Sequence, residues 1–279
     1  MKRVPQISSL QMLGVSHVIA AAILLCFVFD ELVLLYQATL LSYVLILGLC
    51  MLVARILYYY AYSKVDVSEV TIFSALTPAY TLIIAPLFGF TVGWQEALGI
   101  LVISIAVYFF FLPPRNKSIS MLRYLLLPFQ YIISSPPILC TFISTVPPVF
   151  AVIVKKQAID ISSPLLVSFG MCAVIGVLAC ALMLCWKPQK ADQPARQCGS
   201  LAVGLILIIA GALQAIMIVS TSYLLEQTHP ASMQALIRLA IPVQIILAYL
   251  LLREKTQLSN RLLWSVLAVA GGYVVIQAN

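Results

Sequence analysis

Apolar residues run through the chain in long blocks that short polar segments interrupt. Nine blocks have roughly 20 residues each, the length that a helix needs to cross about 30 Å of hydrocarbon. They lie at about residues 10–33, 38–63, 68–90, 94–112, 133–154, 163–186, 200–226, 231–252 and 260–277. Backbone groups in lipid must be hydrogen-bonded within the spanning segment, so we expect helices. The pattern predicts an all-α integral membrane protein with nine transmembrane helices.

Composition and charge distribution support a membrane location. Hydrophobic residues make up 63% of the chain and charged residues 9%, which excludes an ordinary soluble domain. The net charge of +7 does not indicate nucleic-acid binding, because most cations lie in short segments between apolar blocks. Twelve loop cations fall on the side of the N-terminus, and only Lys155 and Lys156 fall on the other side. Since cytoplasmic loops collect Lys and Arg, we expect a cytoplasmic N-terminus in the inner (cytoplasmic) membrane and Asn279 outside.

Two parts of the chain are weak copies of each other. At a constant offset of 164 positions, five residues recur without a gap: Tyr59, Ser68, Pro78, Leu87 and Leu98 as Tyr223, Ser232, Pro242, Leu251 and Leu262. A second match, offset by 154 positions, pairs Lys2, Ile7, Ser8 and Ser9 with Lys156, Ile161, Ser162 and Ser163. The loop at 89–93 has no cation, whereas its counterpart at 253–261 holds three, as expected for repeats that are inverted in the membrane.

The repeat predicts how the chain is divided. We expect a first repeat of four helices over residues 1–115 and a second repeat of five helices over residues 116–279. The fifth predicted helix then lacks a symmetry mate. Because residues 2–9 match residues 156–163, this mate, the first helix of an inverted five-helix repeat, is expected upstream of Met1.

Several segments resemble a known family. The run from Tyr58 to Ser68 (YYYAYSKVDVS), followed by residues 74–78 (SALTP), resembles the third-to-fourth helix signature of EamA-type transporters, which belong to the drug/metabolite transporter superfamily. The segment from Pro242 to Gly271-Gly272 resembles the closing hairpin of that family, and Lys155-Lys156 with Ser162-Ser163-Pro164 resembles its middle section. These loose, mostly apolar motifs cover nearly the whole chain and imply a membrane transporter. Family members normally have ten helices, so the chain departs from the pattern by one predicted helix.

Arg55 and Arg238 are the strongest candidates for a binding site. Each lies well inside a predicted helix, where a charge costs about 2.5–3.5 kcal/mol and normally faces a cavity or a partner. Arg55 lies about ten residues before a helix–helix turn and Arg238 about eight after the corresponding turn, which gives depths of about 12–15 Å. Because inversion places those turns on opposite faces, both arginines are expected near the midplane. A guanidinium there favours an anionic or carboxylate-bearing solute, and snorkelling is the alternative.

Polar neighbours on the same helices extend the candidate site. Residues four apart share a helix face, so Gln234 accompanies Arg238 and Tyr59 accompanies Arg55. Gln214 and Thr221, seven apart, share a face of another predicted helix. The predicted substrate-binding residues are therefore Arg55, Tyr59, Gln214, Thr221, Gln234 and Arg238. Amides and hydroxyls serve equally well as hydrogen bonds between helices, which is the structural alternative for these positions.

Three other features carry structural expectations. Pro78, Pro147, Pro148 and Pro242 lie inside predicted helices, where each removes a backbone hydrogen bond and is expected to produce a kink. The pair Gly271-Gly272 predicts close contact with a neighbouring helix. His17, a lone histidine in an apolar helix, is expected to be a hydrogen-bonded core residue.

These patterns predict a secondary transporter that moves a small, anionic or amino-acid-like metabolite across the membrane by alternating access. All nine acidic residues fall near helix ends or in loops, which leaves the coupling ion open. An intramembrane transferase would need clustered catalytic or metal-binding residues. The seven cysteines lack metal-ligand spacing, and we predict no cofactor. A truncated subunit or scaffold that does not transport is the other alternative. The expected partners are the solute and the lipid bilayer, with homodimer formation as a further expectation.

Overall fold

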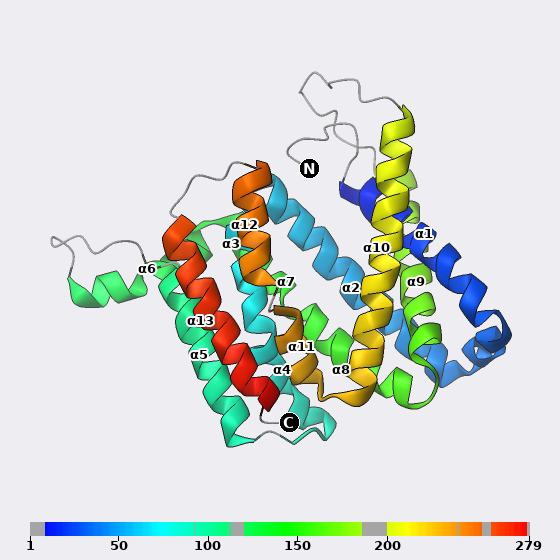
Figure 1. The fold of residues 1–279 in the computed structure, drawn as a ribbon, viewed down its shortest axis with the longest axis horizontal. Coiled ribbons are helices and arrows are strands. Elements are labelled where there is room, and N and C mark those ends of the chain that lie inside the picture. Colours follow the sequence, from blue (N-terminus) through cyan, green and yellow to red (C-terminus); the bar gives the residue numbers. More distant parts are fainter. Residues whose placement is uncertain are drawn as a thin grey trace. The chain divides into compact units, whose positions relative to one another are not determined.

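The computed structural model describes residues 9–91, 93–110, 112, 120–185, 200–238, 240–252 and 258–277. These residues form helices and contain no strand, which confirms the predicted all-α class (Figure 1). The helices in chain order are α1 (Ser9–Val28), η1 (Phe29–Tyr36), α2 (Ala38–Lys64), α3 (Val67–Phe73), η2 (Ser74–Leu76), α4 (Thr77–Ile84), η3 (Ala85–Phe88), α5 (Trp94–Phe110), α6 (Met121–Ser134), α7 (Pro136–Ser144), α8 (Pro147–Asp160), α9 (Pro164–Cys185), α10 (Ser200–Gln227), α11 (Pro230–Arg238), α12 (Ile241–Leu252) and α13 (Leu258–Gln277).

Seven helical segments of the described chain are long and apolar enough, by length and composition, to cross a membrane. They are Leu10–Tyr36, Ala38–Lys64, Glu69–Phe88, Pro136–Asp160, Pro164–Cys185, Val203–Gln227 and Pro230–Leu250. The two other predicted spans correspond to α5 and α13, whose apolar stretches are shorter, at Ala97–Phe110 and Arg261–Val274. The multi-pass membrane fold is therefore confirmed, while the count of nine stays a prediction.

Some of the predicted features lie outside the described residues. These include the N-terminal repeat match at 2–8, the cations Lys2, Arg3, Arg115, Lys117, Lys187, Lys190, Arg196, Arg253 and Lys255, and the terminal Asn279.

The chain forms two compact units, and each contains segments from both halves of the sequence. Unit 1 comprises residues 1–56 and 150–227, and unit 2 comprises residues 57–149 and 228–279. Unit 1 thus holds the first and sixth predicted helices, and unit 2 holds the fourth and ninth. In each of these two pairs, the helices that correspond in the predicted repeat lie in the same unit. The repeat boundaries at 1–115 and 116–279 stay a prediction.

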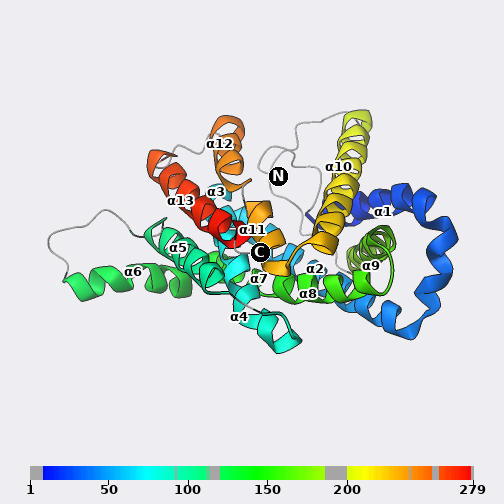
Figure 2. The same ribbon diagram turned by 60° about the horizontal axis from the view of Figure 1, so that its bottom comes forward.

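Corresponding helices pack against each other in antiparallel pairs. In unit 2, α5 and α13 run side by side in both views, with Phe109 stacked on Trp264 at one end and Gly99 against Gly271 farther along (Figures 1 and 2). In unit 1, α1 packs on α9, where Gly14 lies against Cys180 and Gly176 against Val18. An inverted repeat requires related helices to run in opposite directions, and both pairs have this arrangement, while the repeat itself stays a prediction.

The third and eighth predicted spans are both interrupted at corresponding positions. In the third, the 3₁₀ turn η2 separates α3 from α4, and in the eighth a break separates α11 from α12. At the offset of 164, residues 74–76 correspond to residues 238–240. The segments also cross, because α3 packs on α12 and α4 packs on α11. Unit 2 is therefore built around an antiparallel pair of interrupted helices.

The predicted proline kinks are interruptions of the helices. Pro78 is the second residue of α4, Pro242 is the second residue of α12, and Pro147-Pro148 open α8. The first turn of a helix accommodates proline, because its missing N–H would have no intrahelical partner there. Each proline thus begins a new helical segment instead of bending a continuous one.

Contacts between helix ends agree with the predicted topology inside each unit. In unit 2, Arg261 pairs with Asp66 and Glu69 near one end of the third span, and the rings of Phe90 and His229 meet beyond its other end. In unit 1, Ser163 donates to Glu31, and Lys156 donates to the carbonyl of Glu226. All four of these unit 1 residues belong to helix ends that were predicted to face outside.

Gly271 allows the close approach of α13 to α5, as predicted. A Cβ atom at Gly271 would lie 2.8 Å from the carbonyl oxygen of Gly99 and 2.9 Å from the amide nitrogen of Ile103. Both atoms belong to the helix backbone, so relief would require the helices to separate. Gly272 lies near Ala235 of α11, with its nearest atom 3.5 Å from the position of a Cβ atom. The glycine pair therefore sets the distance between neighbouring helices.

Gly271→Leu is expected to lower the free energy of unfolding by about 3 kcal/mol, the cost of overpacking a tight contact. Reversible unfolding in mixed detergent–SDS micelles measures it. Gly204→Leu is the matched control, because no atom lies within 4 Å of a Cβ atom there. That variant gains helix propensity of about 0.5–1 kcal/mol without a clash. Equal stability of the two variants would contradict the close contact between α5 and α13.

Candidate functional site

Arg238 lies where the two interrupted spans of unit 2 cross. It is the last residue of α11, and its guanidinium donates to Thr77 Oγ1, at the first residue of α4, and to Gln234 Oε1, both at 3.2 Å. Thr77 is fully buried and Gln234 is 6% exposed. The predicted pairing of Gln234 with Arg238 is confirmed. A cation at the C-terminal end of α11 also interacts favourably with the helix dipole.

Three hydroxyl groups determine the local backbone around this arginine. Ser74 donates to the carbonyl of Thr71, Thr77 to that of Ser74 and Thr81 to that of Thr77, over distances of 2.6–2.8 Å. Such bonds compete with the α-helical ladder and bend helices, which agrees with the 3₁₀ turn η2 at this place. Thr77 donates to the backbone and accepts from Arg238, so one hydroxyl joins the two spans.

The other predicted binding residues are divided between the units. Arg55 and Tyr59 lie one turn apart on α2, as predicted, but Arg55 belongs to unit 1 and Tyr59 to unit 2. Gln214 and Thr221 lie on α10 in unit 1, whereas Gln234 and Arg238 lie in unit 2. Of the six, only Gln234 and Arg238 are joined by a side-chain hydrogen bond in the described structure. That the six residues bind one solute stays a prediction.

Unit 1 holds a second group of buried polar residues, centred on Lys155. Its ammonium donates to Thr221 Oγ1 at 3.4 Å and to the carbonyl of Ile218 at 3.5 Å. The sequence predicted Lys155 in a loop because the apolar block ends at residue 154. That prediction is wrong, since α8 continues to Asp160 and Lys155 is only 6% exposed.

Two further polar groups of unit 1 are buried, the imidazole of His17 on α1 and the side-chain amide nitrogen of Gln214 on α10. His17 is 2% exposed and its Nδ1 donates to the carbonyl of Leu13 at 2.8 Å, which confirms it as a hydrogen-bonded core residue. On α10, Gln214 Nε2 is buried without a hydrogen bond to any described atom.

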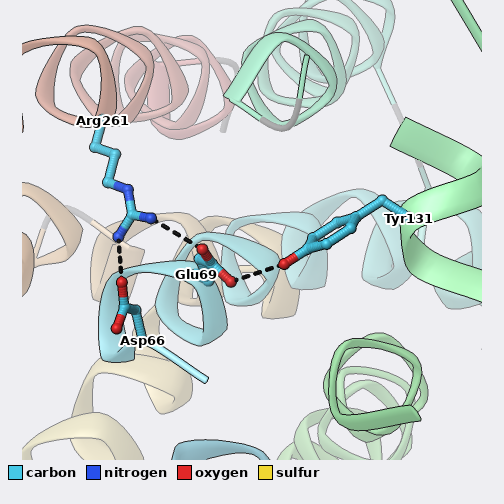
Figure 3. A network of polar contacts seen from close by, with 4 residues as sticks. All are labelled: Asp66, Glu69, Tyr131 and Arg261. Carbon is cyan, nitrogen blue, oxygen red and sulfur yellow. Dashed lines mark hydrogen bonds and ion pairs between the residues drawn. The ribbon is translucent and has the colours of Figure 1, made fainter. Parts of the chain in front are cut away.

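An ion-pair network closes one end of unit 2, and sequence analysis did not predict it. Arg261 at the start of α13 binds Glu69 at 2.9 Å and Asp66 at 3.5 Å, and the Tyr131 hydroxyl on α6 donates to Glu69 at 3.1 Å (Figure 3). Burial and the Glu69 carboxylate raise the pKa of Tyr131 to about 12, so the phenol stays protonated and remains a donor. The network joins α3, α6 and α13.

Comparison with known proteins agrees with this architecture. The EamA-like transporter family model matches residues 1–112, a stretch that ends within a few residues of the predicted boundary between the repeats. A search of curated proteins finds no match. The family match and the long apolar helices together describe a multi-pass membrane protein whose residues 1–112 are similar to the EamA-like transporter family, part of the drug/metabolite transporter superfamily that the sequence resembles.

Proposed function

We propose that this transporter moves a small metabolite with an acidic group across the cytoplasmic membrane by alternating access. The supporting observation is the position of Arg238, a permanent cation at the crossing of two interrupted helices that correspond in the predicted repeat. Many secondary transporters bind their substrate near the membrane midplane, where discontinuous helices of two inverted repeats meet.

The chemistry of Arg238 favours an oxyanion. A guanidinium presents paired N–H donors that match a carboxylate or phosphate, and it stays charged at any physiological pH. The hydrogen bonds to Thr77 and Gln234 involve neutral oxygens and hold the group in a defined orientation. A preorientated cation of this kind binds an acidic solute without first losing much side-chain freedom.

The interruptions also supply a basis for movement. At η2 and between α11 and α12 the regular α-helical hydrogen bonding stops, so the segments on either side can change direction at low energetic cost. Conformational changes of this class use a few terminal positions of helices as hinges. Alternating access would then change the angles at these two positions while the segments remain helical.

Transport into proteoliposomes tests the function directly. The purified protein is reconstituted, exposed to a pooled set of metabolites, and the contents of the vesicles are measured by mass spectrometry. We expect accumulation of solutes that carry a carboxylate or phosphate, above the level in protein-free vesicles. Accumulation only of neutral or cationic solutes would refute the acidic substrate, and no protein-dependent accumulation would favour a non-transporting subunit.

A further inference from the structure

Lys155 is a buried cation that the site around Arg238 does not use. It lies on α8, five residues before the end of the helix at Asp160, which corresponds to about 7–8 Å along the axis. A buried ammonium group without a counter-charge is costly, and a lysine, unlike an arginine, can release its proton and lose the charge. An ionisable residue within a membrane span therefore indicates a functional site.

The described hydrogen bonds of Lys155 do not balance its charge. They are 3.4 and 3.5 Å long and go to neutral oxygens of Thr221 and Ile218. The carbonyl of Ile218 already accepts shorter bonds from the hydroxyls of Thr221 and Ser222, at 2.9 and 2.8 Å. These contacts orient the ammonium toward α10 without supplying a negative charge.

The two partners of Lys155 suit its charged form and its neutral form equally. Thr221 Oγ1 accepts from the ammonium and donates to the carbonyl of Ile218. A hydroxyl is both a donor and an acceptor, so this one can turn its hydrogen toward the lone pair of a neutral amine. The amine can then donate to the Ile218 carbonyl in place of the hydroxyl. Loss of the proton therefore leaves no buried group without a partner.

The adjacent Lys156 has partners of the opposite kind. Its ammonium donates to the carbonyl of Glu226 at 2.7 Å and pairs with the carboxylate of Asp160 at 3.5 Å. Both groups only accept hydrogen bonds, and the carboxylate supplies a negative charge, so they favour the charged lysine. Two neighbouring lysines of α8 thus differ in whether their surroundings hold them charged.

Polar groups continue from Lys155 toward the turn between α8 and α9. Ser222, which donates to the same carbonyl as Thr221, lies with its hydroxyl 2.6 Å from that of Ser168 on α9. Ser168 in turn donates to the carbonyl of Pro164, the first residue of α9, at 2.6 Å. Polar surroundings therefore extend from the lysine to a helix end.

No described carboxylate holds Lys155 in its charged form. The other Asp, Glu, His, Lys and Arg residues of unit 1 that the structure describes are His17 on α1, Asp30 and Glu31 in η1, Arg55 on α2, Lys156 and Asp160 on α8 and Glu226 on α10. The carboxylates among them belong to η1 or to helix ends, and none forms an ion pair with Lys155. Two weaker acids lie on the helices beside α8, the buried thiol of Cys172 on α9 and the exposed phenol of Tyr223 on α10.

We propose that Lys155 binds and releases the proton that couples transport to the pH gradient. In one part of the cycle the ammonium is charged, and in another it gives one proton to water and remains as a neutral amine between Thr221 and Ile218. If the two forms are open to opposite sides of the membrane, each cycle carries one proton across it. This inference rests on the proposed function, because coupling requires a transported solute, and it involves unit 1 alone. It assigns the coupling ion, which the positions of the acidic residues left open.

The protonation of Lys155 is measured directly by NMR of the purified full chain in detergent, without any solute. Lysine labelled with ¹³C at Cε reports the charge of each side chain, and the signals of Lys155 and Lys156 are assigned with the variants Lys155→Met and Lys156→Met. We expect the Lys155 signal to change from its charged to its neutral position within about pH 5–9, while the Lys156 signal stays at the charged position. A Lys155 signal that stays charged over this range would overturn the proposal.

Uptake driven by a pH gradient tests the coupling. Proteoliposomes take up the solute identified in the pooled assay, with the membrane potential held at zero by potassium and valinomycin and with uptake by protein-free vesicles subtracted. For one proton per solute, a gradient of one pH unit changes the accumulation at equilibrium about tenfold. An acidic exterior raises accumulation if proton and solute move together and lowers it if they exchange.

Lys155→Arg and Lys155→Met fix the charge in opposite ways. The guanidinium stays protonated and the thioether has no proton to release, so we expect the gradient to change accumulation by less than about twofold in both variants. Lys156→Met is the matched control and should keep the tenfold response. A tenfold response in either Lys155 variant, or its loss in the control, would contradict the assignment.

The two experiments separate this inference from the proposed function. Transport by the wild-type protein without any response to the gradient would refute proton coupling and leave the proposed function in place. A change of protonation at Lys155 without protein-dependent uptake of any solute would support proton exchange at this lysine and refute the proposed function.

Discussion

Arg238→Ala is expected to abolish transport in proteoliposomes while the protein remains folded and inserted. The variant loses two or more charge-assisted hydrogen bonds to the solute, each worth about 1.5–3 kcal/mol, which corresponds to at least a hundredfold loss of uptake. Insertion should not suffer, because removing a charge from a membrane helix lowers its insertion cost. The initial rate of uptake of the identified solute measures the effect, with equal protein per vesicle verified.

Two further variants separate charge from geometry at this position. Arg238→Lys keeps the positive charge but loses the paired donors, so we expect uptake about tenfold below that of the wild type. Thr77→Val removes the buried hydroxyl that accepts from Arg238 Nη2 at 3.2 Å, and a smaller loss of about three- to tenfold is expected. Normal uptake by Arg238→Ala would remove Arg238 from the binding site.

The contact between Arg238 and Gln234 could be predicted because the determining signals are in the sequence, whereas the place of Arg238 in a central cavity stays a prediction. A permanent charge eight residues into a long apolar block has few stable environments, and its relation to Gln234 follows from helical periodicity. The repeat offset also predicted which helices would correspond. In the structure α5 packs against α13 and α1 against α9 in antiparallel pairs, as inverted copies would, while the repeat itself stays a prediction.

Lys155 could not be predicted, because its environment depends on residues far away in the chain. The segment Lys155-Lys156-Gln157 is polar and follows an apolar block, a pattern that a loop and a helix end share. Its burial results from packing against Thr221 and Ile218, more than sixty positions later. Only the two lysines' different partners distinguish the buried Lys155 from the surface Lys156. Hydropathy alone assigns both to the same loop.

The interruptions of the helices were only partly predictable. Pro78 and Pro242 marked the correct positions, since proline cannot donate a hydrogen bond inside a helix. Whether the helix bends or stops depends on what replaces the missing bonds. Here the hydroxyls of Ser74 and Thr77 bond to backbone carbonyls and the side chain of Arg238 crosses to Thr77. Those partners come from two spans, so the outcome depends on tertiary structure.

A large effect on stability is expected at the ion-pair network of unit 2. Arg261→Met would leave the carboxylates of Asp66 and Glu69 close together without their shared cation. The side chains are mostly buried, with exposures of 12% for Arg261, 29% for Asp66 and 20% for Glu69. Removing one partner from a fully buried pair costs about 3–5 kcal/mol, so partial exposure reduces the expected loss to about 2–4 kcal/mol.

A double-mutant cycle tests whether the network itself carries this stability. Glu69→Gln alone is expected to cost about 1–2 kcal/mol, because Arg261 keeps Asp66 and the amide can still accept from Tyr131. The free energy of unfolding lost in the double variant Arg261→Met/Glu69→Gln should be smaller than the sum of the two single losses by about 1–2 kcal/mol. The reason is that the Glu69 carboxylate, which Arg261→Met leaves without its cation, is absent from the double variant. Unfolding in mixed detergent–SDS micelles provides the four free energies.

Asp160→Asn, at the exposed pair with Lys156, is the control and should change stability by less than about 0.5 kcal/mol. Strict additivity of the two single losses would mean that Arg261 does not stabilise unit 2 through Glu69, and would favour its packing over the Phe110 ring, where the guanidinium carbon lies 5.8 Å from the ring centroid.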